Sequence, residues 1–131
     1  MPGSLLPFSF ATDTPHTIVS TKVYNNNLVR VNIQNKSTTA LIDTGSSINA
    51  ISLSSLNTLY PDVKQLSPSA RSFTTASAES IKTLGKTTLT FYIVEAQVKA
   101  EFYVFKTSNF NFILGTPFLH ANRAVIDMAA G

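Results

Sequence analysis

Apolar and polar residues alternate along most of the chain after residue 16, which is typical of β-strands. The clearest run covers residues 28–33, where three apolar side chains fall on one side and two polar ones on the other. Clusters of turn-forming residues separate such runs. The pattern therefore predicts an all-β domain of about nine short strands. The expected strands cover residues 17–23, 28–33, 38–42, 48–52, 87–94, 98–105, 112–114 and 124–128, with a hairpin over 73–83.

Two short helices and several turns are expected between the strands. Ser52 can cap a helix over residues 53–60 that stops before Pro61, and a second helix begins near Pro117, because proline is favoured at the first helical position. Turns are expected at residues 35–36 and 95–97.

The domain organisation is expected to be simple. Residues 1–15 contain three prolines and several small polar residues, so we expect a flexible N-terminal arm. Residues 16–131 then form a single domain, within which no internal repeat is visible at a fixed period.

The composition supports a folded domain and argues against a nucleic-acid partner. Hydrophobic residues make up 44% of the chain and charged residues only 13%, against roughly 25% in an average soluble domain. The net charge of +3 comes from ten basic and seven acidic residues, and no two of the basic residues are adjacent. Scattered basic residues do not provide a track for a phosphate backbone.

The absence of cysteine narrows the chemistry further. It excludes disulfides, thiolate metal sites and a cysteine nucleophile, and it fits a reducing compartment. The apolar runs are far shorter than the ~20 residues that span a bilayer, so no membrane partner is expected. The first residues carry no basic stretch of the kind that opens a signal peptide.

A candidate catalytic residue lies at the end of the strand over residues 38–42. Segment 41–47 has the sequence Leu-Ile-Asp-Thr-Gly-Ser-Ser, so that Asp43 follows two apolar residues directly. A lone carboxylate at the end of a buried strand needs a partner or a proton, and Gly45 lets the backbone pass close to a neighbouring group. Asp-Thr-Gly is also an ordinary turn sequence, so this segment alone does not decide the function.

A second motif lies about seventy residues further along the chain. Segment 112–119 has the sequence Phe-Ile-Leu-Gly-Thr-Pro-Phe-Leu, in which an apolar strand ends at Gly115 and passes into a helix. In this order, segments 41–47 and 113–115 resemble the motifs of the retropepsin family, the aspartic proteases of retroviruses and long-terminal-repeat retrotransposons. The resemblance covers roughly residues 17–129. It implies a closed barrel or sandwich with one short C-terminal helix, active as a two-fold dimer.

The resemblance also implies residue roles. Asp43 is the catalytic carboxylate, Thr44 reaches across the two-fold axis, and Gly45 brings backbone close to the catalytic pair. Leu114 and Gly115 pass beneath this loop and support it. The hairpin over 73–83 is the flap that closes on a bound peptide. The substrate-binding positions that follow from the resemblance are Ser46, Ser47, Ile113 and, at the flap tip, Ala76, Ser77, Ala78 and Glu79.

A single Asp-Thr-Gly in a chain without repeats predicts a homodimer. Hydrolysis of a peptide without metal or nucleophile needs an acid and a base, and two neighbouring carboxylates supply both by sharing one proton. The other aspartates, Asp13, Asp62 and Asp127, do not repeat the motif. The second carboxylate is therefore expected from a second copy of the chain, with an extended peptide bound across the axis. No cofactor or metal is required.

Several positions differ from the best-known retroviral members. Thr116 stands where they often carry an arginine that helps to hold the dimer, and residues 46–49 lack their substrate-binding acids. The expected flap tip contains no glycine. The hydroxyl of Ser46 is expected to donate to Asp43, which favours the ionised carboxylate and predicts an acidic activity optimum.

Other interpretations stay open. His16 and His120 have no neighbouring ligands that would form a metal site, and no Gly-x-Ser-x-Gly elbow supports a serine hydrolase.

The first functional hypothesis is an endopeptidase that processes a retroelement polyprotein, in the cytoplasm or within retroelement particles. The alternatives are a catalytically silent dimerisation or binding module, and a host protease with a cellular target.

Overall fold

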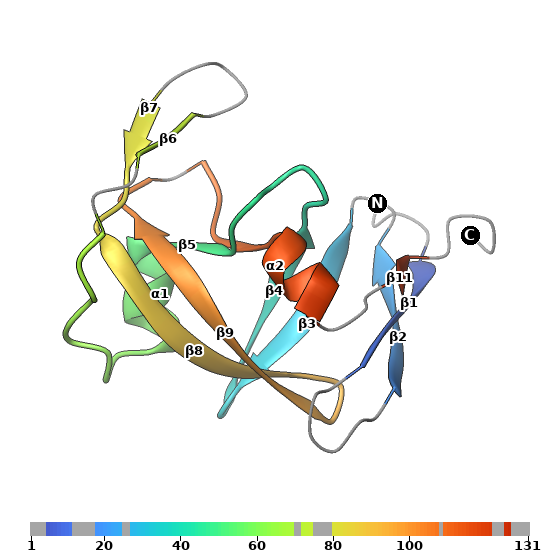
Figure 1. Ribbon diagram of the computed structural model, residues 1–131. Coiled ribbons are helices and arrows are strands. Elements are labelled where there is room, and N and C mark those ends of the chain that lie inside the picture. The colour runs from blue at the N-terminus through green and yellow to red at the C-terminus, as the bar shows by residue number, and fades with distance from the viewer. Residues whose placement is uncertain are drawn as a thin grey trace.

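The computed structural model describes residues 5–11, 18–24, 27–69, 72–74, 80–107, 109–121 and 125–126, and its centre is a closed six-stranded barrel (Figure 1). Strand β10 runs parallel to β4 and antiparallel to β5, and this double pairing closes the barrel. In their order of pairing the barrel strands are β10 (Phe112–Leu114), β4 (Lys36–Ile42), β3 (Leu28–Ile33), β8 (Gly85–Ile93), β9 (Ala96–Phe105) and β5 (Ala50–Ser52). The predicted all-β barrel is confirmed.

The alternation seen in the sequence decides which side chains fill the barrel. In β3, Val29, Val31 and Ile33 are buried while Arg30 is exposed, as the pattern predicts. The same alternation buries Leu89, Phe91 and Ile93 in β8. In β9 it buries Ala96, Val98, Phe102 and Val104. Removing this apolar surface from water stabilises the fold by about 25 cal/mol per Å².

Three phenylalanines from different strands form the centre of the core. Phe91, Phe102 and Phe112 are buried, and their rings meet edge to face at centroid distances of 5.9, 5.5 and 5.1 Å. This geometry directs the positive ring edge at a negative ring face, and each such pair adds about 0.5–1.5 kcal/mol beyond burial. The rings hold β8, β9 and β10 together. They therefore fix β10 in its place beside the last residues of β4.

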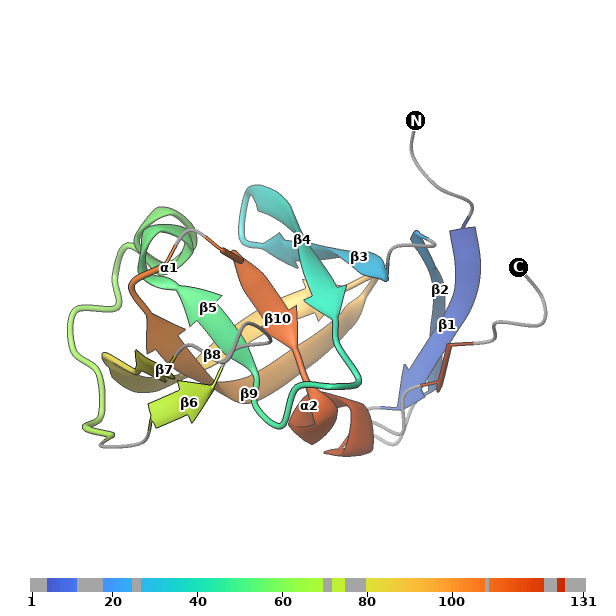
Figure 2. The same cartoon turned by 90° about the horizontal axis from the view of Figure 1, so that it is seen from above.

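A three-stranded sheet with the order β11-β1-β2 lies beside the barrel (Figure 2). It contains β2 (Ile18–Tyr24), β11 (Val125–Ile126) and β1 (Leu5–Ala11). Strand β1 was not expected, because it lies in the segment predicted as a flexible arm, and for residues 5–11 that prediction needs correction. Pro7 lies opposite Lys22 of β2 but beyond the two residues that pair with β11, and an unpaired strand edge tolerates proline.

The predicted hairpin between residues 73 and 83 is present. Strand β6 (Ser72–Thr74) pairs antiparallel with β7 (Ser80–Lys82), with Phe73 opposite Ile81. Figure 1 shows this hairpin projecting beyond the barrel on the edge where the loop between β4 and β5 also lies. The expected flap-tip residues Ala76, Ser77, Ala78 and Glu79 lie outside the described residues.

Both expected helices are present. Helix α1 (Leu53–Leu59) is capped by Ser52, whose hydroxyl accepts a hydrogen bond from the Ser55 N–H at 3.2 Å. Helix α2 (Thr116–Ala121) begins one residue before Pro117, so the proline occupies the first turn, where its missing N–H costs no hydrogen bond. Among the described residues, neither helix nor any other is long and apolar enough to cross a membrane.

The two tight turns of the barrel lie earlier than predicted. They consist of residues 34–35 and 94–95 rather than 35–36 and 95–97, and Ala96 already belongs to β9. Gln34 and Val94 have φ angles of 54° and 57°. Two-residue hairpin turns need positive φ, which normally selects Asn, Asp or Gly. Here strand pairing imposes positive φ on Gln34 and Val94, which are not preferred residues for such a turn. The turns were therefore predicted one residue too late.

Tyr60 joins α1 to the barrel and gives a stability prediction. Its hydroxyl donates to the Thr90 carbonyl at 2.9 Å, and burial raises the pKa of the Tyr60 phenol. Since the unfolded chain loses this proton near pH 10 and the folded chain retains it, the free energy of unfolding should fall as pH rises above about 10. Tyr60→Phe should cost about 0.5–1.5 kcal/mol below that pH and should weaken the alkaline decline. Urea unfolding of both proteins from pH 8 to 11 measures this, and identical alkaline slopes would contradict it.

Candidate active site

Asp43 lies immediately after β4, where the parallel pairing with β10 ends. Leu41 pairs with Ile113 and Ile42 with Leu114, and the Asp43 N–H donates to the Leu114 carbonyl at 3.0 Å. The structure thus brings together two motifs that are far apart in the sequence. The predicted course of β10 beside the Asp43 loop is the observed one, and it fixes the backbone from which the carboxylate projects.

The Asp43 carboxylate is oriented by the turn that follows it. The Gly45 N–H donates to Asp43 Oδ1 at 2.9 Å, and the Ser46 N–H donates to the Asp43 carbonyl at 3.2 Å. Asp43 is half-buried, whereas Thr44 and Gly45 are exposed in the single chain. A hydrogen bond from a backbone N–H to a carboxylate is of the strong, charge-assisted kind. The turn therefore holds the carboxylate at the rim of the barrel, next to the exposed Thr44 and Gly45.

Gly115 lies against the underside of this loop at a distance that only glycine permits. A Cβ atom at this position would lie 2.1 Å from the Ile48 carbonyl oxygen and 2.7 Å from that of Ser46. The next residue, Thr116, donates its N–H to the Ser46 carbonyl at 2.8 Å. Because both contacts are with backbone atoms, the loop cannot give way by a rotamer change. Leu114 and Gly115 thus lie directly against the loop that carries Asp43.

Asn49 connects the loop to the barrel and was not recognised in the sequence as a structural residue. It is 3% exposed, its Oδ1 accepts from the Gly115 N–H at 2.9 Å, and its Nδ2 donates to the Glu101 carbonyl at 3.2 Å. Its own carbonyl accepts from the Tyr103 N–H at 2.9 Å. The sequence does contain one indication of this role, because Asn49 lies within the apolar run Ile-Asn-Ala-Ile. An amide buried in such a run requires hydrogen-bond partners.

A substitution at Asn49 can remove one of its two side-chain hydrogen bonds while keeping the other. Asn49→Asp keeps the acceptor for the Gly115 N–H but turns a carboxylate toward the Glu101 carbonyl. A buried carboxyl group without a cation favours its protonated form, which can still donate to that carbonyl. We therefore expect a loss of about 1–3 kcal/mol in unfolding free energy at pH 7.5 and partial recovery at pH 4.5. Denaturant unfolding at both pH values measures the effect.

Asn49→Leu is the matched control for this prediction. Leucine has a similar volume and makes neither hydrogen bond. Because it does not titrate, the loss of unfolding free energy that it causes should not depend on pH. If Asn49→Asp were as stable as the original protein at pH 7.5, the assigned hydrogen bond to Glu101 would be wrong.

The expectation for the Ser46 hydroxyl was wrong. It donates to the Ile48 carbonyl at 2.7 Å and accepts from the Ile48 N–H at 3.4 Å, so its proton is used within the loop. The Gly45 N–H, and not Ser46, contacts the Asp43 carboxylate. A serine near an acid has local backbone groups as competing partners, and these decide its orientation here. The acidic optimum inferred from a Ser46 contact therefore loses its basis.

Of the other predicted substrate-binding residues, the structure describes Ser47 and Ile113. Ser47 is exposed beside the half-buried Ile48, and Ile113 is half-buried on the side of β10 opposite its core-facing neighbours. In the part of the chain that the structure describes, no group of three or more His, Cys, Asp or Glu side chains could hold a metal ion. His120 is exposed at the end of α2, and His16 lies outside the described residues.

The described acidic residues other than Asp43 lie on different elements. Asp62 follows α1, Glu95 occupies the turn between β8 and β9, and Glu101 lies on β9 and pairs with Lys86 at 3.6 Å. None of them belongs to the loop that carries Asp43. Within the described chain, the site thus consists of one oriented carboxylate at an open edge.

This architecture is that of the retropepsin-like proteins. The chain resembles the retroviral protease-like domain of Ddi1 from Leishmania major, with a TM-score of 0.63 over 80% of this chain and 82% of that one, at 14% identity. The family model for retroviral aspartyl protease matches residues 24–127, and the chain belongs to this family. A search of curated proteins found no match.

Proposed function

We propose that the chain is an aspartic endopeptidase that acts as a homodimer, with one Asp43 from each copy forming the catalytic pair. The observation that carries the proposal is the Asp43 turn itself. Its carboxylate is oriented by the Gly45 N–H, its backbone is bonded to Leu114, and Gly115 supports it from below. The hydrogen bond to Gly45 alone is common in turns, but here the same turn is also bonded to β10 and backed by Gly115.

Two such carboxylates provide the acid and the base for peptide hydrolysis. Placed side by side, they share one proton because both cannot easily be charged. The ionised member takes a proton from water, and the oxygen of that water forms a bond with the scissile carbonyl carbon. The protonated member donates to the carbonyl oxygen. Collapse of this intermediate breaks the C–N bond, and the amine leaves with a proton.

The exposed part of the loop supports assembly into a dimer. Thr44 and Gly45, next to the catalytic carboxylate, are exposed in the single chain, and a two-fold axis beside them would bring equivalent loops into contact. Thr44 then lies where its hydroxyl can bond to the second copy.

The proposed substrate is an extended peptide lying between the Asp43 loop and the β6–β7 hairpin. An exposed edge of the hairpin can bond to its backbone as a neighbouring strand would. Ile113, half-buried beside the loop, offers apolar contact to side chains near the cleaved bond. As the natural substrate we propose a retroelement polyprotein. The fold shared with a Ddi1 domain supports a cellular substrate as the second candidate.

Solution mass and activity at falling protein concentration test the proposal. A shared site requires the cleavage rate per chain to fall as the mass moves from that of two chains to that of one. A single chain with full activity would refute the shared catalytic pair. A stable dimer that cleaves no peptide in a diverse library would favour the binding-module alternative.

A further inference from the structure

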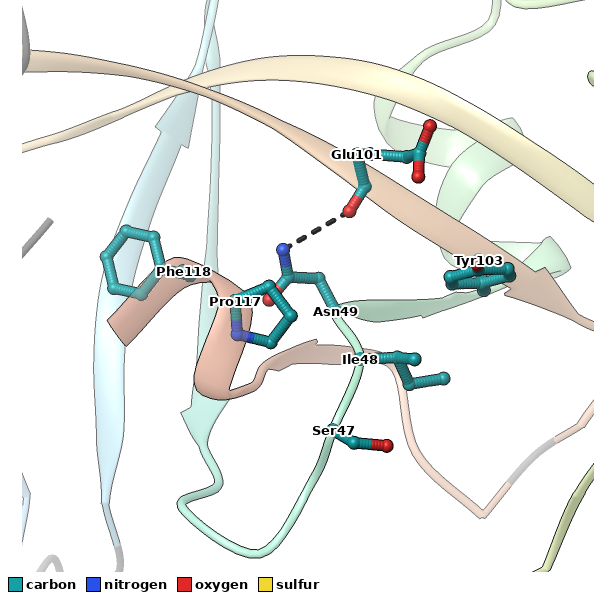
Figure 3. A pocket seen from close by; sticks show the side chains of 7 residues that line it. All are labelled: Ser47, Ile48, Asn49, Glu101, Tyr103, Pro117 and Phe118. Atoms are coloured by element: carbon teal, nitrogen blue, oxygen red, sulfur yellow. Dashed lines mark hydrogen bonds between the residues drawn. The ribbon is translucent and has the colours of Figure 1, made fainter. Parts of the chain in front are cut away.

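A pocket of about 230 Å³ lies between the outer face of β9, the start of α2 and the end of the Asp43 loop (Figure 3). Its lining includes Ser47 and Ile48 from the loop, Pro117 from α2, and Glu101 and Tyr103 from β9. Pockets that hold whole small molecules are usually larger, about 300–1,000 Å³. The volume suits one side chain of a larger ligand.

The position of the pocket places it along the proposed substrate path. Ser47 and Ile48 follow Asp43 by only four and five residues, so the segment that leaves the catalytic turn forms the pocket wall. An extended peptide advances about 3.3 Å per residue. A substrate side chain three or four residues from the cleaved bond therefore lies roughly 10–13 Å from it, outside the positions next to Asp43.

The walls combine apolar surface with one acidic group. Ile48 and Pro117 offer aliphatic contact, and Tyr103 adds an aromatic ring on the same face of β9 as Glu101. Figure 3 shows Glu101 and Tyr103 following one another along β9, across from Ile48 and Ser47. A long aliphatic stem could pack between these walls while its cationic end meets the carboxylate, which is how lysine and arginine divide their contacts.

Lys86 already pairs with Glu101, but this ion pair leaves room for a competitor. The Nζ–Oε2 distance is 3.6 Å, and the two side chains are 36% and 52% exposed. Exposed pairs of this kind contribute little, typically 0–1 kcal/mol. A substrate cation held by the pocket walls can therefore displace Lys86 from Glu101.

We propose that this pocket is an accessory subsite that accepts a lysine or arginine side chain of the peptide substrate, several residues from the cleaved bond. The inference rests on the proposed protease function and adds a charge preference to it. Glu101 determines that preference and Lys86 opposes it. Neither residue takes part in the chemical step.

The test compares peptides in which lysine, norleucine or glutamate is placed in turn at each position from the second to the fifth residue on either side of the cleaved bond. One outer position should favour lysine over norleucine in kcat/KM. Glu101→Gln should reduce that ratio roughly two- to fivefold, the range of an exposed ion pair. Lys86→Gln should raise the ratio, because it removes the competing cation. Glu95→Gln removes an equal charge at the distant β8–β9 turn and should leave the ratio unchanged.

Binding measurements separate this inference from the protease proposal. Fluorescence anisotropy of the same peptides on the Asp43→Asn chain reports the preference without turnover. If no peptide is cleaved but lysine peptides bind more tightly in a manner dependent on Glu101, the subsite stands and the protease proposal fails. Cleavage or binding with no lysine preference at any position, or a preference for glutamate, overturns the subsite.

Discussion

Replacing Asp43 by asparagine is expected to reduce peptide cleavage by at least ~10³-fold, since each copy then loses a group that general acid–base catalysis requires. An amide can neither take a proton from water nor share one with its counterpart. The side chain has nearly the same shape and can still accept from the Gly45 N–H through its oxygen. Folding should therefore be preserved, and thermal unfolding of both proteins checks this.

Mixing experiments extend this prediction to the dimer. If the catalytic pair is shared, an Asp43→Asn chain should inhibit the original chain by forming mixed dimers with one carboxylate. With a ninefold excess of the inactive chain, only about one in ten active chains finds an active partner. Activity should then fall about tenfold after subunit exchange.

The matched control in this mixture is an Asp62→Asn chain, which lacks a carboxylate elsewhere on the surface. It should form mixed dimers that retain activity. Unchanged cleavage by the Asp43→Asn chain, or activity that the excess of inactive chain leaves untouched, would show that Asp43 is not part of a shared catalytic pair.

Gly115→Ala is expected to have the largest effect on stability. The added methyl group would lie 2.1 Å from the Ile48 carbonyl oxygen and 2.7 Å from that of Ser46. Overpacking usually costs 1–3 kcal/mol, and a clash with two backbone oxygens should exceed about 3 kcal/mol because no side chain can move aside. Chemical denaturation measures the loss, and cleavage should disappear with it.

Gly45→Ala provides the contrast. The nearest atom to its added methyl group is Asp43 Oδ1, at 3.3 Å, which belongs to a side chain that can shift. We expect a small change in stability, below about 1 kcal/mol, together with a marked loss of activity as the carboxylate moves. Equal stability of the Gly115→Ala and original proteins would refute the close approach beneath the loop.

Much of the barrel could be predicted from the sequence because period-two alternation reports directly which side chains are buried. Strands β3 and β10 begin and end at the expected residues, and Ser52 caps α1 as its position before the helix suggests. Strand β1 was missed because prolines and small polar residues hide the alternation. Its pairing with β11 depends on a segment that is distant in the sequence.

The chain by itself determined the catalytic candidate and the companion motif, because each is a short string of residues with recognisable chemistry. Only the tertiary structure decided how they cooperate. It placed Gly115 against the loop, gave the buried Asn49 its partners from two other segments, and directed the Ser46 hydroxyl away from Asp43. Hydrogen-bond partners and contact distances belong to residues brought together by folding, so spacing along the chain carries no record of them.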